Sequence, residues 1–260
     1  MPEGDTVHLV ARNLRAALAG QVLVHADLRV PALAAVDLSG QTVVDVVARG
    51  KHLLTRFDGG STLHTHLRME GAWHLHRPGA RWSGGPGHEV RVVLATGPWT
   101  AVGYRLGVVE LLPSTAEHLA VGHLGPDLLA DDFDAAEAVR RLLADPDRAV
   151  GEAVLDQRNL AGIGNLYKAE VLFLSGVSPW RPVAQVGDIF ALVRRARRLL
   201  QANAARAAQV TTGDTRPGHT TWVYGRRGKP CRRCGTAIRS ADQGAAPAAR
   251  VTYWCPSCQP

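Results

Sequence analysis

The sequence predicts an α+β protein built of several domains. Three observations support this fold class: apolar residues recur at helical spacing near the start, short β-rich runs follow, and helical segments then lead into a basic tail that holds all four cysteines. A chain of 260 residues with 46% hydrophobic content is long enough to bury one large core or two to three small ones. We therefore expect a folded chain with distinct parts.

The first predicted element is a helix over residues 5–19. Apolar side chains recur there with a helical period, and Gly20 supplies a stop signal. The apolar positions are Val7, Val10, Leu14 and Leu18. Charged residues interrupt this segment where a signal peptide would need an apolar stretch, and no run approaches the roughly 18 apolar residues of a membrane span. The sequence therefore predicts a cytoplasmic protein without a membrane partner.

Pro2 and Glu3 stand directly before the predicted helix and allow two interpretations. Proline suits the first turn of a helix, where its missing N–H is not needed, and an acid there complements the helix dipole. Alternatively, removal of Met1 exposes Pro2 as a secondary amine, which forms a charged iminium with an aldehyde in one condensation. These residues alone favour the first interpretation, and the motifs further along the chain decide between the two.

From Gln21 to about Leu112 the chain consists of short β-rich runs separated by Gly, Pro or Asp-Gly, which predicts a β-sandwich or barrel of roughly eight strands. The runs are QVLVHADLRV, TVVDVVARG, KHLLTRF, STLHTHLRM, AWHLH, EVRVVLA and GVVELL. Four helical segments follow, over residues 133–146, 151–159, 165–176 and 188–208, and the cysteine unit begins near Thr220. We therefore predict domains over residues 1–115, 116–219 and 220–260.

The chain is basic, and its basic residues are concentrated near the C-terminus. Thirty Lys and Arg against 23 Asp and Glu give a net charge of +7 and a pI near 9.7, as expected of a protein that binds a polyanion. Between residues 216 and 241 there are seven basic residues and no acid. A second cluster at Arg194, Arg195, Arg197 and Arg198 lies in a predicted helix, where a solvated helix face explains it equally well.

The four cysteines form the pattern C-x2-C-x20-C-x2-C. Cys231 and Cys234 lie in KPCRRCGT, and Cys255 and Cys258 lie in YWCPSCQP. This spacing suits two knuckles that share one tetrahedral zinc ion. Two disulfides or free thiols are the alternatives, and a reducing cytoplasm disfavours them. Because four thiolates leave no open coordination position, we expect one structural zinc ion per chain that holds a β-hairpin.

The segment NLAGIGNLYKAE joins two of the predicted helices. Gly162 and Gly164 permit a tight turn, and we expect Asn165 to cap the helix that follows. Free N–H groups at such a helix start form an anion site suited to a phosphate. A helix-packing corner is the alternative, but the basic chain and the cysteine motif favour contact with a DNA backbone.

Four blocks of the sequence together resemble the formamidopyrimidine-DNA glycosylase and endonuclease VIII family, over the whole chain. They are MPEG at the start, ARGKHLL around Lys51, LDQRNLAGIGNLYKAE, and ARVTYWCPSCQP at the end. MPEG followed by a polar residue is similar to the endonuclease VIII branch. The resemblance implies an N-terminal helix on a two-layer β-sandwich, a helix-two-turn-helix domain and a C-terminal β-hairpin zinc finger, with DNA in the cleft between the lobes.

The resemblance also implies an activity, that of a bifunctional DNA glycosylase and abasic-site lyase of base excision repair. The amine of Pro2 would attack the anomeric carbon of an oxidised nucleoside, a pyrimidine rather than a purine, while Glu3 donates a proton to the sugar ring oxygen. The resulting iminium permits β,δ-elimination of the flanking phosphates. Lys51 matches the family's hairpin lysine, a catalytic residue that contacts phosphate and donates a proton during elimination. Arg250 matches the arginine at the zinc hairpin tip, also placed in the catalytic site, which grips the phosphates that flank the lesion, and Asn165 matches the backbone-binding asparagine. Without the family, Lys51 would be an ordinary lysine at a strand start.

The side chains expected to replace a flipped-out base depart from the family pattern. In HTHLRMEGAWHLH, the residues Arg68, Met69 and Glu70 align with the Gln-Leu-Tyr of the endonuclease VIII pattern. Met69 can wedge between bases with Arg68 beside it, whereas Glu70 is expected to turn away from phosphate. His123 stands where the pattern has an arginine that contacts phosphate. These departures concern the substrate range rather than the reaction class.

The expected partner is double-stranded DNA that contains oxidised bases or abasic sites, bound by a monomer associated with the nucleoid. Two alternatives use the same scaffold: an abasic-site lyase with little glycosylase activity, and a non-catalytic protein that binds damaged DNA. Pro2 and Glu3 argue against the second, because a binder needs neither. A zinc-ribbon transcription or RNA-associated factor would explain the cysteines and the charge but not MPEG.

Overall fold

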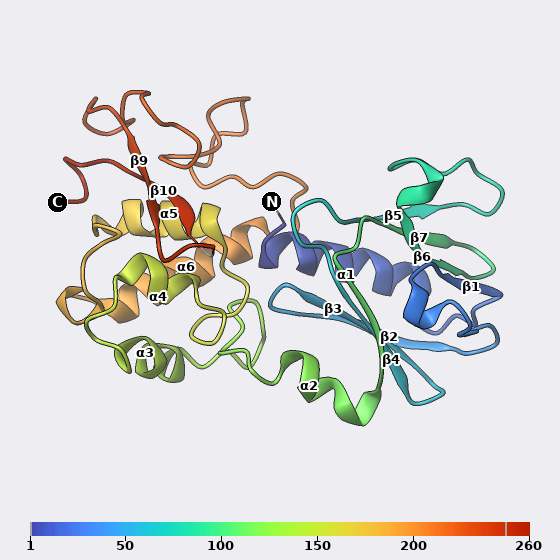
Figure 1. Ribbon diagram of the computed structural model, residues 1–260. Coiled ribbons are helices and arrows are strands. Elements are labelled where there is room, and N and C mark those ends of the chain that lie inside the picture. Colours follow the sequence, from blue (N-terminus) through green and yellow to red (C-terminus); the bar gives the residue numbers. More distant parts are fainter. Residues whose placement is uncertain (1, 248) are drawn as a thin grey trace. The chain divides into compact units, whose positions relative to one another are not determined.

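The chain forms two compact units, Met1–His123 and Leu124–Pro260, in a computed structural model that describes residues 2–247 and 249–260 (Figure 1). Each unit has its own hydrophobic core, so the N-terminal and C-terminal halves are described separately. No helix among the described residues is both long enough and apolar enough to cross a membrane.

The first unit contains helix α1 (Gly4–Leu18) and two antiparallel sheets of four strands each. One sheet has the order β2 (Val43–Arg49), β3 (His52–Phe57), β4 (Ser61–His66), β8 (Val108–Pro113). The other has the order β1 (His25–Leu28), β6 (Val90–Ala95), β7 (Thr100–Tyr104), β5 (Ala72–His76). Buried side chains of α1 and of both sheets form one core, which confirms the predicted helix and eight-stranded β-sandwich.

Strand β7 was not among the seven runs expected from the sequence, and its composition explains the omission. Its segment contains Gly103, which interrupts the pattern of β-forming side chains. A Cβ atom at Gly103 would lie 2.6 Å from the Leu106 side chain, so the glycine allows that side chain to pack against the strand. The short helix α2 (Glu117–Val121), also in this unit, was missed as well.

The second unit contains the four helices that the sequence predicts, each ending earlier than predicted. They are α3 (Ala135–Leu143), α4 (Val150–Leu155), α5 (Asn165–Ser175) and α6 (Ile189–Asn203). Asp134 and Asp188 cap α3 and α6 through their carboxylates, as the preference of aspartate for N-caps predicts. Residues 165–173 of α5 are all buried, so α5 is the central helix of this unit. Gly176 ends α5 with a left-handed φ of 67°.

The chain ends in an antiparallel hairpin of β9 (Arg239–Gln243) and β10 (Arg250–Trp254), which packs on α5 (Figure 1). A small apolar cluster joins the hairpin region to the helix through Ala169 and Phe173 of α5 and Val223, Cys231, Ile238 and Cys255. Four short 3-10 helices complete the described elements, at Pro31–Leu33, Gly87–Glu89, Ser114–Ala116 and Val183–Gln185.

Candidate functional site

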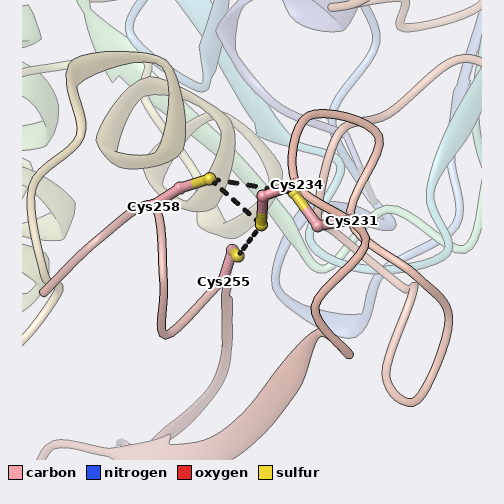
Figure 2. Close-up of side chains that lie close together, drawn as sticks. All are labelled: Cys231, Cys234, Cys255 and Cys258. Carbon is pink, nitrogen blue, oxygen red and sulfur yellow. Dashed lines mark hydrogen bonds between the residues drawn. The ribbon is translucent and has the colours of Figure 1, made fainter.

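The four cysteines converge on one point beyond the hairpin (Figure 2). Their Sγ atoms all lie within 4.8 Å of one another, with separations of 3.9 Å for Cys231–Cys258, 3.5 Å for Cys234–Cys255 and 3.6 Å for Cys234–Cys258. A tetrahedral zinc ion with Zn–S bonds of about 2.3 Å requires sulfur atoms about 3.8 Å apart. The donor set therefore fits one structural zinc ion, and none of these cysteines is in a disulfide.

The thiols need a cation to ionise together. Burial, followed by the neighbouring thiols, raises the pKa of Cys258 to about 12, and burial also raises the pKa of Cys255. By contrast, hydrogen bonds with Thr236 lower the pKa of Cys234 to about 6. Since zinc binds thiolates rather than thiols, a bound metal would supply the positive charge that stabilises all four together.

Two contacts that sequence reasoning missed fasten the zinc knuckles to α5. Gln259 accepts a hydrogen bond from the Cys255 N–H and donates to the Val177 carbonyl, in the loop just after α5, at 2.9 and 2.8 Å. Arg233 of the first knuckle lies over the Phe173 ring of α5, 4.6 Å from its centroid. The knuckles are therefore held in place by contacts with α5 and the loop that follows it.

The start of α5 differs from the expectation for Asn165. Gly164 occupies the cap position and makes no side-chain cap bond, so the predicted capping role of Asn165 is wrong. Asn165 is the first helical residue, and its Nδ2 donates to the Val251 carbonyl of β10 at 2.8 Å. Gly162, with φ of 97°, allows the chain to bend sharply just before the helix.

Two buried ionisable residues of α5 also hold the C-terminal region, and sequence reasoning missed both. Lys168 donates from Nζ to Thr252 Oγ1 of β10 at 2.6 Å. Glu170 accepts hydrogen bonds from the backbone N–H groups of residues 222–224 and from Thr211 Oγ1. Desolvation raises the pKa of Glu170, and these donors oppose that effect. Arg250, at the exposed start of β10, is thus carried by a hairpin that α5 positions.

The N-terminal residues lie before α1 rather than inside it. Glu3 is the N-cap residue and is completely buried, while Pro2 precedes it and is half-buried. The interpretation of Pro2 as a first-turn helical proline is therefore wrong. Met1, whose removal would free the Pro2 nitrogen, lies outside the described residues.

Lys51 sits at the tip of the β2–β3 hairpin. Arg49 and His52 are paired across the strands, so Gly50 and Lys51 form the two-residue turn. Gly50 has φ of 58°, the left-handed conformation that such turns require. Burial, then the positive charges of the nearby Arg68 and Lys51, lower the pKa of His66 to about 4.

The turn between β4 and β5 carries the expected wedge residues. Arg68 has φ of 53° without being a glycine, and Met69 is 62% exposed despite its apolar side chain. The Arg105 side chain donates to the Glu70 carbonyl at 3.2 Å, and Arg105 also has a positive φ, of 48°. A Cβ atom on Gly107 would lie 2.1 Å from Arg68 Cγ, so Arg68 rests directly on that backbone. Strained backbone and an exposed apolar tip are typical of functional turns.

Histidines surround the Lys51 hairpin, and only one of them was expected. His52 stacks on His64 and meets His66 and His123 edge-on, with ring centroids 5.0, 5.0 and 6.0 Å away. The alternation of His64 and His66 in β4 could have signalled a shared face, but their proximity to His52 depends on strand pairing. His123 itself is exposed, as a phosphate-contacting residue would need to be.

Family models match along the chain in the order expected from the resemblance. Residues 1–104 match the formamidopyrimidine-DNA glycosylase N-terminal domain, residues 124–214 the helix-two-turn-helix domain of the same enzyme, and residues 228–260 the zinc finger found in that enzyme and in isoleucyl-tRNA synthetase. The chain belongs to the formamidopyrimidine-DNA glycosylase and endonuclease VIII family.

Curated relatives support this membership over whole chains. A probable endonuclease 8 2 of Streptomyces coelicolor is 58% identical over 100% of this chain and 94% of its own length. A DNA-(apurinic or apyrimidinic site) lyase Nei2 of Mycolicibacterium smegmatis is 49% identical over 100% and 99%. Among solved structures, the Lactococcus lactis Fpg bound to abasic-site DNA shares the fold, with a TM-score of 0.82 at 24% identity over 99% of both chains.

Proposed function

We propose that this protein is a bifunctional DNA glycosylase and abasic-site lyase of base excision repair. The observation that carries the proposal is the pair at the N-terminus, where a proline is followed at once by a fully buried carboxylic acid at the start of α1. Family membership supports it, as do the names of the relatives, endonuclease 8 and abasic-site lyase. A phosphate-binding protein without chemistry would require neither residue.

In the proposed reaction, the Pro2 nitrogen attacks C1′ of the damaged nucleotide and the glycosidic bond breaks, so that the base leaves with the bonding electrons. Glu3 donates a proton to the ring oxygen as the sugar opens, a step suited to a carboxyl group removed from bulk water. The product is an iminium between Pro2 and C1′. Its positive charge acidifies C2′, and elimination then releases first the 3′ and then the 5′ phosphate.

Attack requires an unprotonated secondary amine. An ordinary α-amino group titrates near 7.7–8.0, so an appreciable fraction is free at neutral pH. The proposal therefore includes removal of Met1, because an amide nitrogen at Pro2 would not be a nucleophile.

Basic side chains in both units, together with the N-terminal end of α5, are proposed to bind the DNA backbone. Lys51 at its hairpin tip and exposed His123 would serve in the first unit, and Arg250 and the α5 start at Asn165 in the second. Arginine offers a bidentate fork to phosphate. The zinc ion supplies no chemistry here, and its proposed role is to stabilise the hairpin that carries Arg250.

A flipped-out base leaves a gap in the duplex that costs a few kcal/mol. Exposed Met69 on its strained turn is suited to fill that gap, with Arg68 beside it. Glu70 is also exposed, and its carbonyl rather than its carboxylate is held by Arg105. Preference for oxidised pyrimidines over purines stays a prediction that follows from the similarity of the MPEG start to the endonuclease VIII branch. Monomeric action on the nucleoid stays a prediction.

An abasic-site lyase with little glycosylase activity is the second candidate, favoured by a 49%-identical relative named as such a lyase. Borohydride trapping separates the candidates. A bifunctional enzyme forms a covalent adduct with duplexes that contain either an oxidised pyrimidine or an abasic site, whereas the lyase forms one only with the abasic duplex. Absence of both adducts in protein whose intact mass shows that Met1 is removed would contradict the proposed function.

A further inference from the structure

A hydrogen-bonded chain of three side chains crosses the β3–β4–β8 sheet beside the Lys51 hairpin. Glu110 of β8 meets His64 of β4 at 3.0 Å, from carboxylate Oε2 to ring Nδ1. The other nitrogen of His64, Nε2, lies 2.8 Å from Nδ1 of His52 on β3. Antiparallel pairing of β4 with β3 and with β8 places the three residues on one face. The chain runs from an exposed carboxylate through a buried ring to a half-buried one.

The hydrogen-bond partners along this chain set the tautomer of each neutral ring. A carboxylate only accepts hydrogen bonds, so His64 donates from Nδ1, and a neutral His64 then offers a lone pair at Nε2. The neighbouring ring must therefore donate, which places the His52 proton on Nδ1. Nε2 of His52 is left as an unprotonated base. In many enzymes a carboxylate orients one histidine through such a hydrogen bond, and here a second histidine ring follows the first.

Titratable groups surround that base. Around His52, the titratable neighbours that act on it are His64, His66 and His123, and the charged one is Arg68. Burial, then these neighbours, lower the pKa of His52 to about 3. Lys51 acts in the same direction on the adjacent His66. In the free protein the rings of His52 and His66 are thus neutral at pH 7, and the Glu110 carboxylate lies at the far end of the hydrogen-bonded chain.

Binding of an anion would favour the protonated form of His52. A phosphodiester attracted by Lys51 and Arg68 presents only oxygen acceptors, and a neutral imidazole that offers a lone pair repels it. Protonation turns that nitrogen into a charged donor, which forms a shorter and stronger bond to phosphate oxygen. The cost of the new charge is reduced because Glu110 stabilises positive charge at the other end of the chain through His64.

We propose that the Glu110–His64–His52 chain is a proton-linked phosphodiester site, which takes up one proton from solvent when a DNA phosphate binds beside Lys51. The proton adds to the His52 lone pair, and no covalent bond breaks. His52 is a positioning residue for DNA in this scheme, and Glu110 acts through the two rings. The inference rests on the proposed function, since it assumes that DNA is the ligand.

Calorimetry tests the proposal directly. The probe is a duplex with one tetrahydrofuran abasic analogue, titrated at pH 5.0 and 7.0 in buffers of different ionisation enthalpy, so that the slope of the measured enthalpy gives the protons taken up. The pKa of His52 is about 3 in the free protein, and one nearby charge shifts a pKa by about 1–3. We therefore expect uptake that approaches one proton at pH 5.0 and is small at pH 7.0, with affinity that weakens by up to about tenfold per pH unit between them. His52→Asn keeps a donor near the Nδ1 position and should lose most of both effects, and Glu110→Gln should reduce them.

Two further variants serve as controls. His25→Asn alters an exposed histidine on β1 of the other sheet and should match the wild type. His123→Asn should weaken binding but keep proton uptake. Uptake that survives in His52→Asn, or that disappears in His123→Asn alone, would overturn the assignment while leaving the proposed function intact. Failure of the wild type to bind any duplex would overturn both.

Discussion

The zinc site leads to a quantitative prediction about the C-terminal hairpin. Cys255→Ser removes one of four sulfur ligands. Without metal, the hairpin and second knuckle retain four side-chain hydrogen bonds to or from α5 and its flanking loop, made by Asn165, Lys168, Gln243 and Gln259. At about 1 kcal/mol each, these contribute about 4 kcal/mol. A structural zinc ion contributes about 10–16 kcal/mol, so its loss outweighs them.

We therefore expect Cys255→Ser to bind less than one zinc per chain and to exchange the amide protons of residues 239–254 rapidly. Strands β3 and β4 should keep their protection, because their core lies in the first unit. Metal analysis and hydrogen exchange measure these outcomes. Ser257→Ala is the matched control, because Ser257 lies in the same knuckle and is exposed, but is not a ligand. A variant that loses zinc yet keeps slow exchange in the hairpin would refute this reasoning.

Three other predictions concern single residues or pH. Glu3→Gln should lower excision of an oxidised pyrimidine by about a hundredfold or more while strand cleavage at a preformed abasic site falls far less, and equal losses in the two gel assays would contradict a role limited to ring opening. Arg250→Ala should weaken binding to all duplexes and reduce the slope of log affinity against log salt by about 0.9, whereas an unchanged slope would remove Arg250 from the phosphate contacts. The folded-state pKa values of His52 and His66 lie below the unfolded value near 6.5, so unfolding takes up protons and the free energy of unfolding should fall as pH drops from 6.5 toward 4. Urea titrations at pH 7 and 5 should differ by about 1 kcal/mol after allowance for solvent screening, and by less in His52→Asn.

Local pattern was enough to predict the helices of the second unit, seven of the eight sandwich strands and the metal ligands. Helical spacing, glycine stops and the two C-x2-C pairs each depend on residues a few positions apart. Dependence on neighbouring residues alone also explains why the capping prediction for Asn165 was wrong. A Gly-Asn sequence before a helix predicts an asparagine cap, whereas Asn165 instead reaches a carbonyl 86 residues away in β10.

The long-range partners were decided by tertiary structure alone. Lys168 meets Thr252 across 84 positions, and His64 meets Glu110 across 46. In the sequence, Lys168 is one more polar residue of a helix, and His52 and His64 are unremarkable members of two strands. Burial makes them informative, because an ionisable group removed from water must find a partner or remain neutral. The sequence by itself determined which chemical groups the protein has, and strand pairing and helix packing decided which of them act together.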